Sequence, residues 1–273
     1  MTEYLLDTSL IRSLSAGEER ELSGRKGAFS LTASYIAPFE LLSGTKPKDD
    51  PMAESENKLR KAALGRYYRL VGFDGTYWED EDVLICKAFG IKHPSRDTSD
   101  LKQLIRDCVN ARHLDEIESP YLKEIRQMDT ITIHEYRAEF ESFSHEARGD
   151  KTYILVSLGI IACTGVVPEI VSKMTHEEVG RLAEKLRSRY NGSLDLVIDS
   201  WFEYVKEPRT FQRACKKMKN DVFDWKHILY LRVGDTNQFF ITEDRDLLAL
   251  VKKVAPDRVL DKIDFFNRIC AGE

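Results

Sequence analysis

The chain has 273 residues, of which 42% are hydrophobic and 32% are charged; this composition supports a folded core and excludes a wholly disordered chain. The length suits one large domain or two modest ones. Lysine and arginine together number 41, and aspartate and glutamate 46, so the formal net charge of −5 excludes a globally basic nucleic-acid binder but not a local basic face.

The N-terminal part of the chain alternates short apolar runs with amphipathic segments. We predict strands at residues 4–6 and 28–35, each followed by a segment with helical spacing. Pro38 is compatible with the second of these helices, because proline is tolerated in a first turn. The helices predicted in this part span residues 9–14, 36–42, 56–68 and 79–89.

The middle of the chain, residues 93–210, has helical spacing throughout and no convincing alternating strand. We therefore predict that these residues form an all-helical insertion. Their longest uncharged run, Thr152 to Pro168, is shorter than the ~20 residues of a membrane-spanning helix. We expect Tyr153–Cys163 to form the buried centre of the insertion and no association with a membrane, since an exposed apolar run would be prone to aggregation.

The C-terminal part returns to strands that alternate with helices. We predict helices at 211–233, 246–254 and 262–269, and strands at 239–242 and 258–260. Alternation at both ends of the chain predicts an α/β fold whose parallel sheet is covered by helices on both faces. The predicted domains are the sheet domain, residues 1–92 and 211–273, and the inserted block, residues 93–210.

Cysteine and histidine usage excludes several common kinds of site. The five cysteines are scattered and form no C-x-x-C pair, which argues against a disulfide framework or zinc ribbon and favours a reducing, cytoplasmic location. The six histidines lack metal-binding spacing, and no glycine-rich motif for ATP or a dinucleotide is present. Zinc, ATP and dinucleotide binding therefore have no support in the sequence.

Five acids stand where they can meet at one edge of the predicted sheet. Asp7 directly follows the first strand, and Asp244 follows the strand at 239–242. Glu40 lies one helical turn past the second strand, and Asp221 and Asp224 share a face of the long helix. Converging carboxylates repel one another unless a cation neutralises them, and Mg²⁺ or Mn²⁺ is the natural choice. Such ions can activate water and hold a phosphodiester.

Four motifs then resemble those of the PIN-domain family. They are Leu5-Leu6-Asp7-Thr8-Ser9, Pro38-Phe39-Glu40-Leu41-Leu42-Ser43-Gly44, Asn220-Asp221-Val222-Phe223-Asp224-Trp225-Lys226-His227 and Thr242-Glu243-Asp244. The resemblance covers roughly residues 1–92 and 211–273, and the block at 93–210 has no counterpart in a minimal member of the family.

The resemblance implies a three-layer α/β/α fold and an Mg²⁺- or Mn²⁺-dependent ribonuclease, a class that includes the toxin nucleases of toxin–antitoxin pairs. Its expected partners are single-stranded RNA, an inhibitory antitoxin-like protein and a second copy of the chain. Thr8 and Thr242 would supply hydroxyls near the metal. The implied catalytic residues are Asp7, Glu40, Asp224 and Asp244, and the implied metal ligands are these four and Asp221.

Each acid also has a simpler interpretation. Asp7 and Asp244 are well placed to cap the helices that follow them. Glu40 can be an exposed helix acid, and Asp221 and Asp224 can be solvated. Of the two acids on the long helix, Asp224 is the favoured ligand, because a histidine and a tyrosine follow it at the spacing of the motif, and Asp221 would then be a second ligand.

A basic stripe leads along the predicted long helix toward these acids. Arg213, Lys217, Asp221 and Asp224 are spaced by four, four and three residues and therefore fall on one side of the helix. The stripe is either a solvated face with local ion pairs or a track that holds RNA by its phosphates.

The sequence thus predicts endonucleolytic hydrolysis of single-stranded RNA by a metal-dependent enzyme. A PIN-like scaffold with weak or no catalysis, which binds RNA or a protein partner, is the alternative. A nuclease directed at DNA is a third interpretation. The presence of all the acids favours the enzyme.

Overall fold

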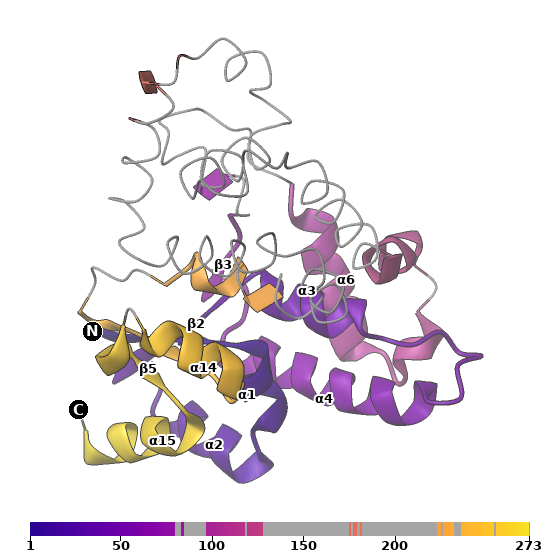
Figure 1. The fold of residues 1–273 in the computed structure, drawn as a ribbon. Coiled ribbons are helices and arrows are strands. Elements are labelled where there is room, and N and C mark those ends of the chain that lie inside the picture. The colour runs from indigo at the N-terminus through magenta and orange to yellow at the C-terminus, as the bar shows by residue number, and fades with distance from the viewer. Residues whose placement is uncertain are drawn as a thin grey trace. The chain divides into compact units, whose positions relative to one another are not determined.

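The protein is an α/β protein built on a five-stranded, all-parallel sheet (Figure 1). The computed structural model describes residues 1–79, 83–84, 97–117, 119–127, 175, 177–178, 181, 223–224, 226–231, 236–253 and 255–272. The strands are β1 (Thr2–Leu6), β2 (Phe29–Ser34), β3 (Thr76–Tyr77), β4 (Gln238–Ile241) and β5 (Val259–Leu260). Their order across the sheet is β3-β2-β1-β4-β5.

The central strands are apolar because both faces of the sheet are covered. Tyr4 of β1 is in register with Leu31 of β2 and Phe239 of β4, and all three belong to one hydrophobic core. Successive residues of a strand point to opposite faces, so Leu5 and its partner Phe240 lie on the other face, where both are completely buried. Apolar side chains on both faces are typical of strands in parallel sheets.

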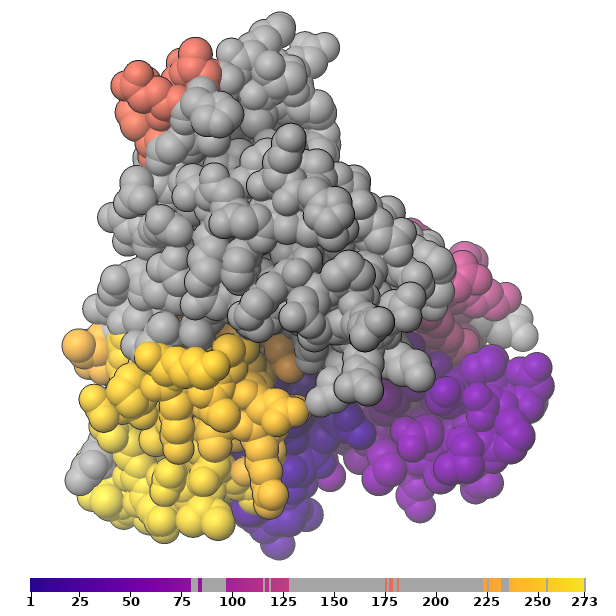
Figure 2. All heavy atoms as spheres, in the orientation of Figure 1, coloured from indigo at the N-terminus to yellow at the C-terminus, as the bar shows by residue number. Residues whose placement is uncertain are grey.

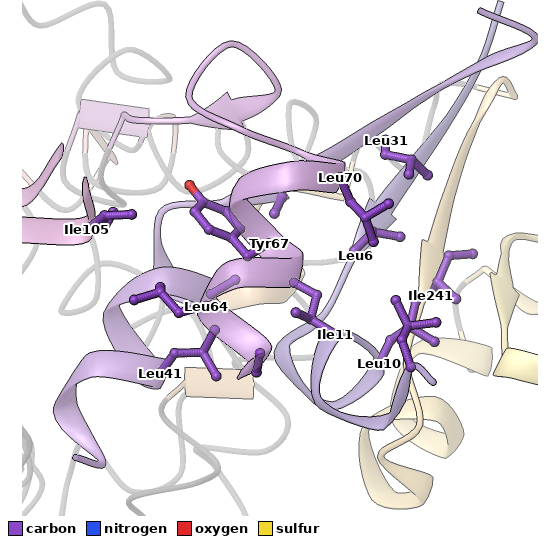
Figure 3. Packing of buried hydrophobic residues seen from close by; sticks show 14 of the residues in the cluster. Leu6, Leu10, Ile11, Leu31, Leu41, Leu64, Tyr67, Leu70, Ile105 and Ile241 are labelled. Atoms are coloured by element: carbon purple, nitrogen blue, oxygen red, sulfur yellow. The ribbon is translucent and has the colours of Figure 1, made fainter. Parts of the chain in front are cut away.

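One face carries most of the described helices. α1 (Thr8–Ser13) and α2 (Ala16–Gly24) connect β1 to β2, and α3 (Ile36–Ser43) and α4 (Ala53–Leu70) connect β2 to β3. Figure 3 shows side chains of α1 and α4 packed over those of the central strands. α15 (Lys262–Ala271) joins this core, since the ring of its Phe265 packs edge-on to that of Tyr4, with centroids 4.9 Å apart.

The opposite face is covered in part by α14 (Arg245–Lys252), which connects β4 to β5. Its Leu247 and Val251 are buried but do not belong to the core that holds Tyr4. α14 and α15 lie on opposite sides of β5 (Figure 1). Two short 3₁₀ helices, η1 (Leu114–Glu116) and η3 (Pro256–Arg258), complete the elements described here.

The first helix of the middle block packs on α4. This helix, α6 (Ser99–Asn110), places Leu104 and Ile105 in the same core as Tyr67 of α4. Lys102 and Arg106 of α6 lie over the aromatic rings of Trp78 and Phe73, at 4.6 and 4.9 Å from the ring centroids. Burial also raises the pKa of the Cys108 thiol to about 12.

The elements predicted at 4–70 and 239–269 agree with the structure to within a few residues at their ends, and the helices predicted at 79–89 and 211–233 lie mostly outside the described residues. The predicted strand at 28–35 is observed at Phe29–Ser34, and the helix predicted at 36–42 is observed at Ile36–Ser43. α2 and β3 were not predicted. α2 begins with a capping box formed by Ser15 and Glu18, which is the signal that identifies it in the sequence. β3 has only two residues and carries no periodicity.

The chain divides into two compact units. The first comprises Met1–Trp78, Asp97–Ile131 and Asp235–Glu273, and the second Glu79–Arg96 and Thr132–Gly234. These bounds differ from those expected for an insertion at 93–210, because α6 packs with the sheet unit. Most of that expected insertion, including Tyr153–Cys163, lies outside the described residues, so its all-helical character stays a prediction. Within the described part of the chain, no helix is long and apolar enough to cross a membrane.

Candidate functional site at the β1 and β4 edge

The strand order creates one point at which the chain reverses its direction across the sheet. From β1 the chain moves to β2 and β3 on one side, and it later returns to β4, on the other side of β1, and continues to β5. The segments that follow β1 and β4 therefore leave toward opposite faces. In open α/β sheets such a point, at the carboxyl ends of the strands, is where ligands bind.

Asp7 occupies this edge directly after β1. Only 4% of its surface is exposed, and its carboxylate caps α1. Its Oδ2 accepts hydrogen bonds from the backbone nitrogen of Ser9 at 3.2 Å, from Ser9 Oγ at 2.5 Å and from Thr242 Oγ1 at 2.8 Å. The Asp7 backbone nitrogen donates to the carbonyl oxygen of Ile241 at 3.0 Å. The carboxylate is therefore held in one orientation by donors from both strand ends.

Thr242 joins the two ends of the site. It follows β4 directly and is completely buried. Besides donating to Asp7, its Oγ1 accepts a hydrogen bond from the backbone nitrogen of Asp244 at 3.0 Å. It lies 3.1 Å from Ser9 Oγ, which in turn accepts from the backbone nitrogen of Glu243 at 2.9 Å. One hydroxyl thus links segments that are 235 residues apart in the chain.

Asp244 is the second carboxylate of this cluster. Its Oδ1 caps α14 by accepting from the backbone nitrogens of Asp246 at 2.8 Å and Leu247 at 3.0 Å. Its Oδ2 accepts no hydrogen bond in the part of the chain that the structure describes. The side chain is half-buried, so the carboxylate is oriented by its cap while remaining accessible from the edge of the sheet.

We refer to Asp7, Ser9, Thr242 and Asp244 as the edge cluster. Asp7 and Asp244 were candidates in the sequence, and the structure links them through Thr242. The structure also shows that both acids cap helices, which was the simpler interpretation of each. The cap made by Asp7 uses Oδ2, and the cap made by Asp244 uses Oδ1.

Ser9 is the member of the edge cluster to which the sequence motif assigned no role. Thr8 and Thr242 were the expected hydroxyls, and the structure shows that the hydroxyl of Ser9 also reaches Asp7, beside that of Thr242. The signal for it was present, since a serine two residues after a capping aspartate lies within reach of the cap.

Of the remaining predicted site residues, the structure describes Glu40 and Asp224. Glu40 is half-buried one turn into α3, and its backbone carbonyl accepts a hydrogen bond from Arg60 Nη1 at 3.2 Å. Since α3 starts where β2 ends, Glu40 belongs to the same edge of the sheet as Asp7. Asp224 is half-buried in the second compact unit. Asp221, Arg213 and Lys217 lie outside the described residues.

A second carboxylate network was not predicted. Glu3 Oε1 accepts hydrogen bonds from Thr32 Oγ1 at 3.0 Å, Tyr77 Oη at 2.6 Å and Gln238 Nε2 at 2.7 Å. These donors come from β2, β3 and β4. The network ties four strands together across a sheet face. It explains why a charged residue is tolerated within β1 and gives it a structural role.

The chemistry of the edge cluster is that of hard oxygen donors. Its side chains offer two carboxylates and two hydroxyls, a set that suits Mg²⁺ or Mn²⁺ better than softer metals. Within the described residues no group of three or more histidine, cysteine, aspartate or glutamate side chains is arranged to hold a metal ion. The donor types therefore fit such an ion, and further acids would be needed to complete its shell.

Comparison of the chain with protein-family models, with curated proteins and with solved structures yields no match. The geometry of the edge cluster is thus the basis for assigning a function.

Proposed function

We propose that this chain is a metal-dependent, PIN-like endoribonuclease that hydrolyses phosphodiester bonds of single-stranded RNA. The observation that supports this most is the edge cluster itself. Two aspartates that follow neighbouring strands are linked by the buried hydroxyl of Thr242, which donates to the Asp7 carboxylate and accepts from the Asp244 backbone nitrogen, at the point where the sheet reverses direction. Acids and hydroxyls at this position are suited to hold a cation and a phosphate.

The residues of the chain have distinct roles in this proposal. Asp7 and Asp244 hold Mg²⁺ or Mn²⁺, with Glu40, Asp224 and Asp221 as the further acids that the resemblance assigns to the site. When bound, the ion would supply an activated water and neutralise charge on the phosphate. Ser9 and Thr242 act by positioning Asp7, since their hydrogen bonds fix its carboxylate before substrate arrives.

A PIN-like scaffold without catalysis is the second candidate. It is favoured by the observation that Asp7 and Asp244 both cap helices, which accounts for an aspartate at each position without any chemistry. Such a scaffold would bind RNA or a protein partner. An antitoxin-like inhibitor, a second copy of the chain and a cytoplasmic location remain predictions of the sequence under either candidate.

A nuclease assay with Asp7→Asn separates the two candidates. Asparagine caps helices as well as aspartate does, so this change preserves α1 but removes the charge that a cation needs. The full chain is incubated with labelled single-stranded RNA, or DNA of the same sequence, in Mn²⁺, Mg²⁺ or EDTA. We expect RNA fragments in Mn²⁺ or Mg²⁺, none in EDTA, and none with Asp7→Asn, whose melting temperature serves as the folding control.

Other results would point elsewhere. If Asp7→Asn cleaves RNA at the parent's rate, Asp7 has no part in the reaction and this proposal is contradicted. RNA that is bound but left intact in every metal supports the scaffold, and faster cleavage of DNA supports the DNA-directed nuclease.

A further inference from the structure

A groove runs along the side of α4 within the first compact unit. Its volume is about 940 Å³, and it is flanked by the start of α2, the loop at 48–51 and the end of α6 with η1. Small residues of α4, including Ala62 and Gly65, line it. The purple surface of α4 is part of the visible face in Figure 2.

The lining of the groove is strongly basic in a protein whose net charge is −5. It contains six lysine and arginine side chains and three acids: Lys48, Lys58, Lys61, Arg66, Arg69 and Arg112 against Glu19, Asp50 and Glu54. His113 also lines it. A basic concavity on an acidic protein concentrates anions locally.

The ion pairs that do form leave most of this positive charge uncompensated. Glu19 pairs with Arg69, and Asp50 pairs with Lys46, which lies outside the groove. Arg66 donates to the backbone carbonyl oxygens of Ile11 and Arg12 at 3.1 and 3.0 Å. These acceptors are neutral, so they do not offset the positive charge of the guanidinium group. Four of the six cations that line the groove form neither a side-chain hydrogen bond nor an ion pair with any residue that the structure describes. They are Lys48, Lys58, Lys61 and Arg112.

The arrangement of these cations suits a chain of phosphates. Lys58 and Lys61 are three residues apart on α4, so their Cβ atoms are ~5–6 Å apart on one face. Lys48 lies in the loop before α4 and Arg112 just after α6, and both line the groove. Cations spaced along a groove can contact successive charges of a polyanion without reading its bases. The small residues Ala62 and Gly65 in the lining leave room for a backbone.

We infer that the groove along α4 is a binding site for the backbone phosphates of single-stranded RNA. The choice of RNA as the polyanion rests on the proposed function. The site is distinct from the predicted stripe of Arg213 and Lys217, and it belongs to the same compact unit as the edge cluster. It gives the enzyme a second hold on its substrate, away from the strand edge where the bond is cut.

The test compares two triple variants that change the charge equally. The first is Lys58→Gln with Lys61→Gln and Arg112→Gln, three side chains without hydrogen bonds in the described structure. The control is Lys123→Gln with Lys252→Gln and Lys253→Gln, which are exposed and do not line the groove. Binding of a fluorescent 20-nucleotide RNA is measured by anisotropy in EDTA at several KCl concentrations, so that neither metal nor cleavage contributes.

We expect the groove variant to bind RNA about tenfold more weakly and the control to bind within about twofold of the parent. The logarithm of the binding constant falls linearly with the logarithm of the salt concentration, and each lost phosphate contact on a single strand makes this slope shallower by about 0.7. Three lost contacts should therefore make it shallower by about 2. Equal losses in the two variants, or a parent that does not bind RNA in EDTA, would overturn the groove assignment. Polyglutamate of similar length is added as a competitor at the same concentration of negative charge as the RNA. If it displaces the RNA, the groove is a site for acidic proteins rather than for RNA.

The groove and the nuclease can fail separately. If the parent binds RNA through the groove but never cleaves it, the groove assignment is supported and the nuclease proposal is contradicted. If the parent cleaves RNA but the groove variant binds RNA as well as the control does, the nuclease proposal is supported and the groove assignment is contradicted.

Discussion

At the scale of single residues, the edge cluster shows how a capping residue can also be a candidate ligand. Asp244 uses one oxygen to cap α14, and the other accepts no hydrogen bond in the described residues. Three donors reach the Oδ2 of Asp7. Thr242 is the residue on which both acids depend, because it contacts the carboxylate of one and the backbone of the other.

Thr242→Val tests this dependence. Valine has nearly the same shape but no hydroxyl, so a buried carboxylate loses a donor and the Asp244 nitrogen loses its acceptor. We expect the free energy of unfolding, measured by urea denaturation, to fall by ~1–3 kcal/mol. Thr242→Ser, which keeps the hydroxyl, is the matched control and should lose less. A valine variant as stable as the serine variant would show that the hydroxyl does not organise the cluster.

At the scale of elements, the site is built from strand ends that pass at once into helices. One residue, Asp7, separates β1 from α1, and three residues separate β4 from α14. Connections this short leave the carboxylates little freedom. α2 supports the same region, because its Glu18 pairs with Lys262 Nζ at 3.0 Å and the Lys262 backbone nitrogen donates to Glu243 Oε1 at 2.9 Å.

Ser15→Ala tests the support that α2 provides. Ser15 Oγ accepts from the Glu18 nitrogen at 3.3 Å, and Glu18 accepts from the Ser15 nitrogen at 2.7 Å. Loss of this capping box should lower the free energy of unfolding by ~1 kcal/mol, seen as an earlier midpoint in urea with an unchanged slope. Ser15→Asp, which retains a capping oxygen, should stay close to the parent. If alanine and aspartate behave alike, the capping bond contributes nothing measurable.

At the scale of the whole molecule, the proposed site predicts that metal binding and folding are linked. An ion held by Asp7 and Asp244 binds the folded chain and not the unfolded one, because these residues meet only when β1 and β4 are paired. The folded state then gains RT ln(1 + [M]/Kd), which is ~2.7 kcal/mol at one hundred times Kd.

Thermal melting with Mn²⁺, Mg²⁺ and EDTA measures this linkage. We expect the melting temperature to rise with millimolar Mn²⁺, and the rise to shrink in Asp7→Asn and in Asp244→Asn. The groove variant should respond as the parent does, since its three changes lie away from the edge cluster. A melting temperature that is the same in EDTA and in Mn²⁺ would count against a preformed metal site.

Local patterns determined much of the architecture. The apolar runs at β1, β2 and β4, each followed by helical spacing, were sufficient to predict a parallel α/β sheet, because strands that alternate with helices pair in parallel and are covered on both faces. They also placed Asp7 and Asp244 at strand ends. β3 could not be found in this way, since two residues have no period.

Only the tertiary structure decided what these residues contact. The capping role of Asp7 is local, but its bond to Thr242 spans 235 residues and depends on β4 pairing with β1. The bond from Ser9 to the same carboxylate is local, and the contact of Ser9 Oγ with Thr242 again depends on that pairing. The α4 groove has the same origin: the spacing of Lys58 and Lys61 is visible in the sequence, but Arg112 joins them only because α6 packs on α4. Residue spacing determines which side chains share an element, and long-range packing alone determines which elements share a site.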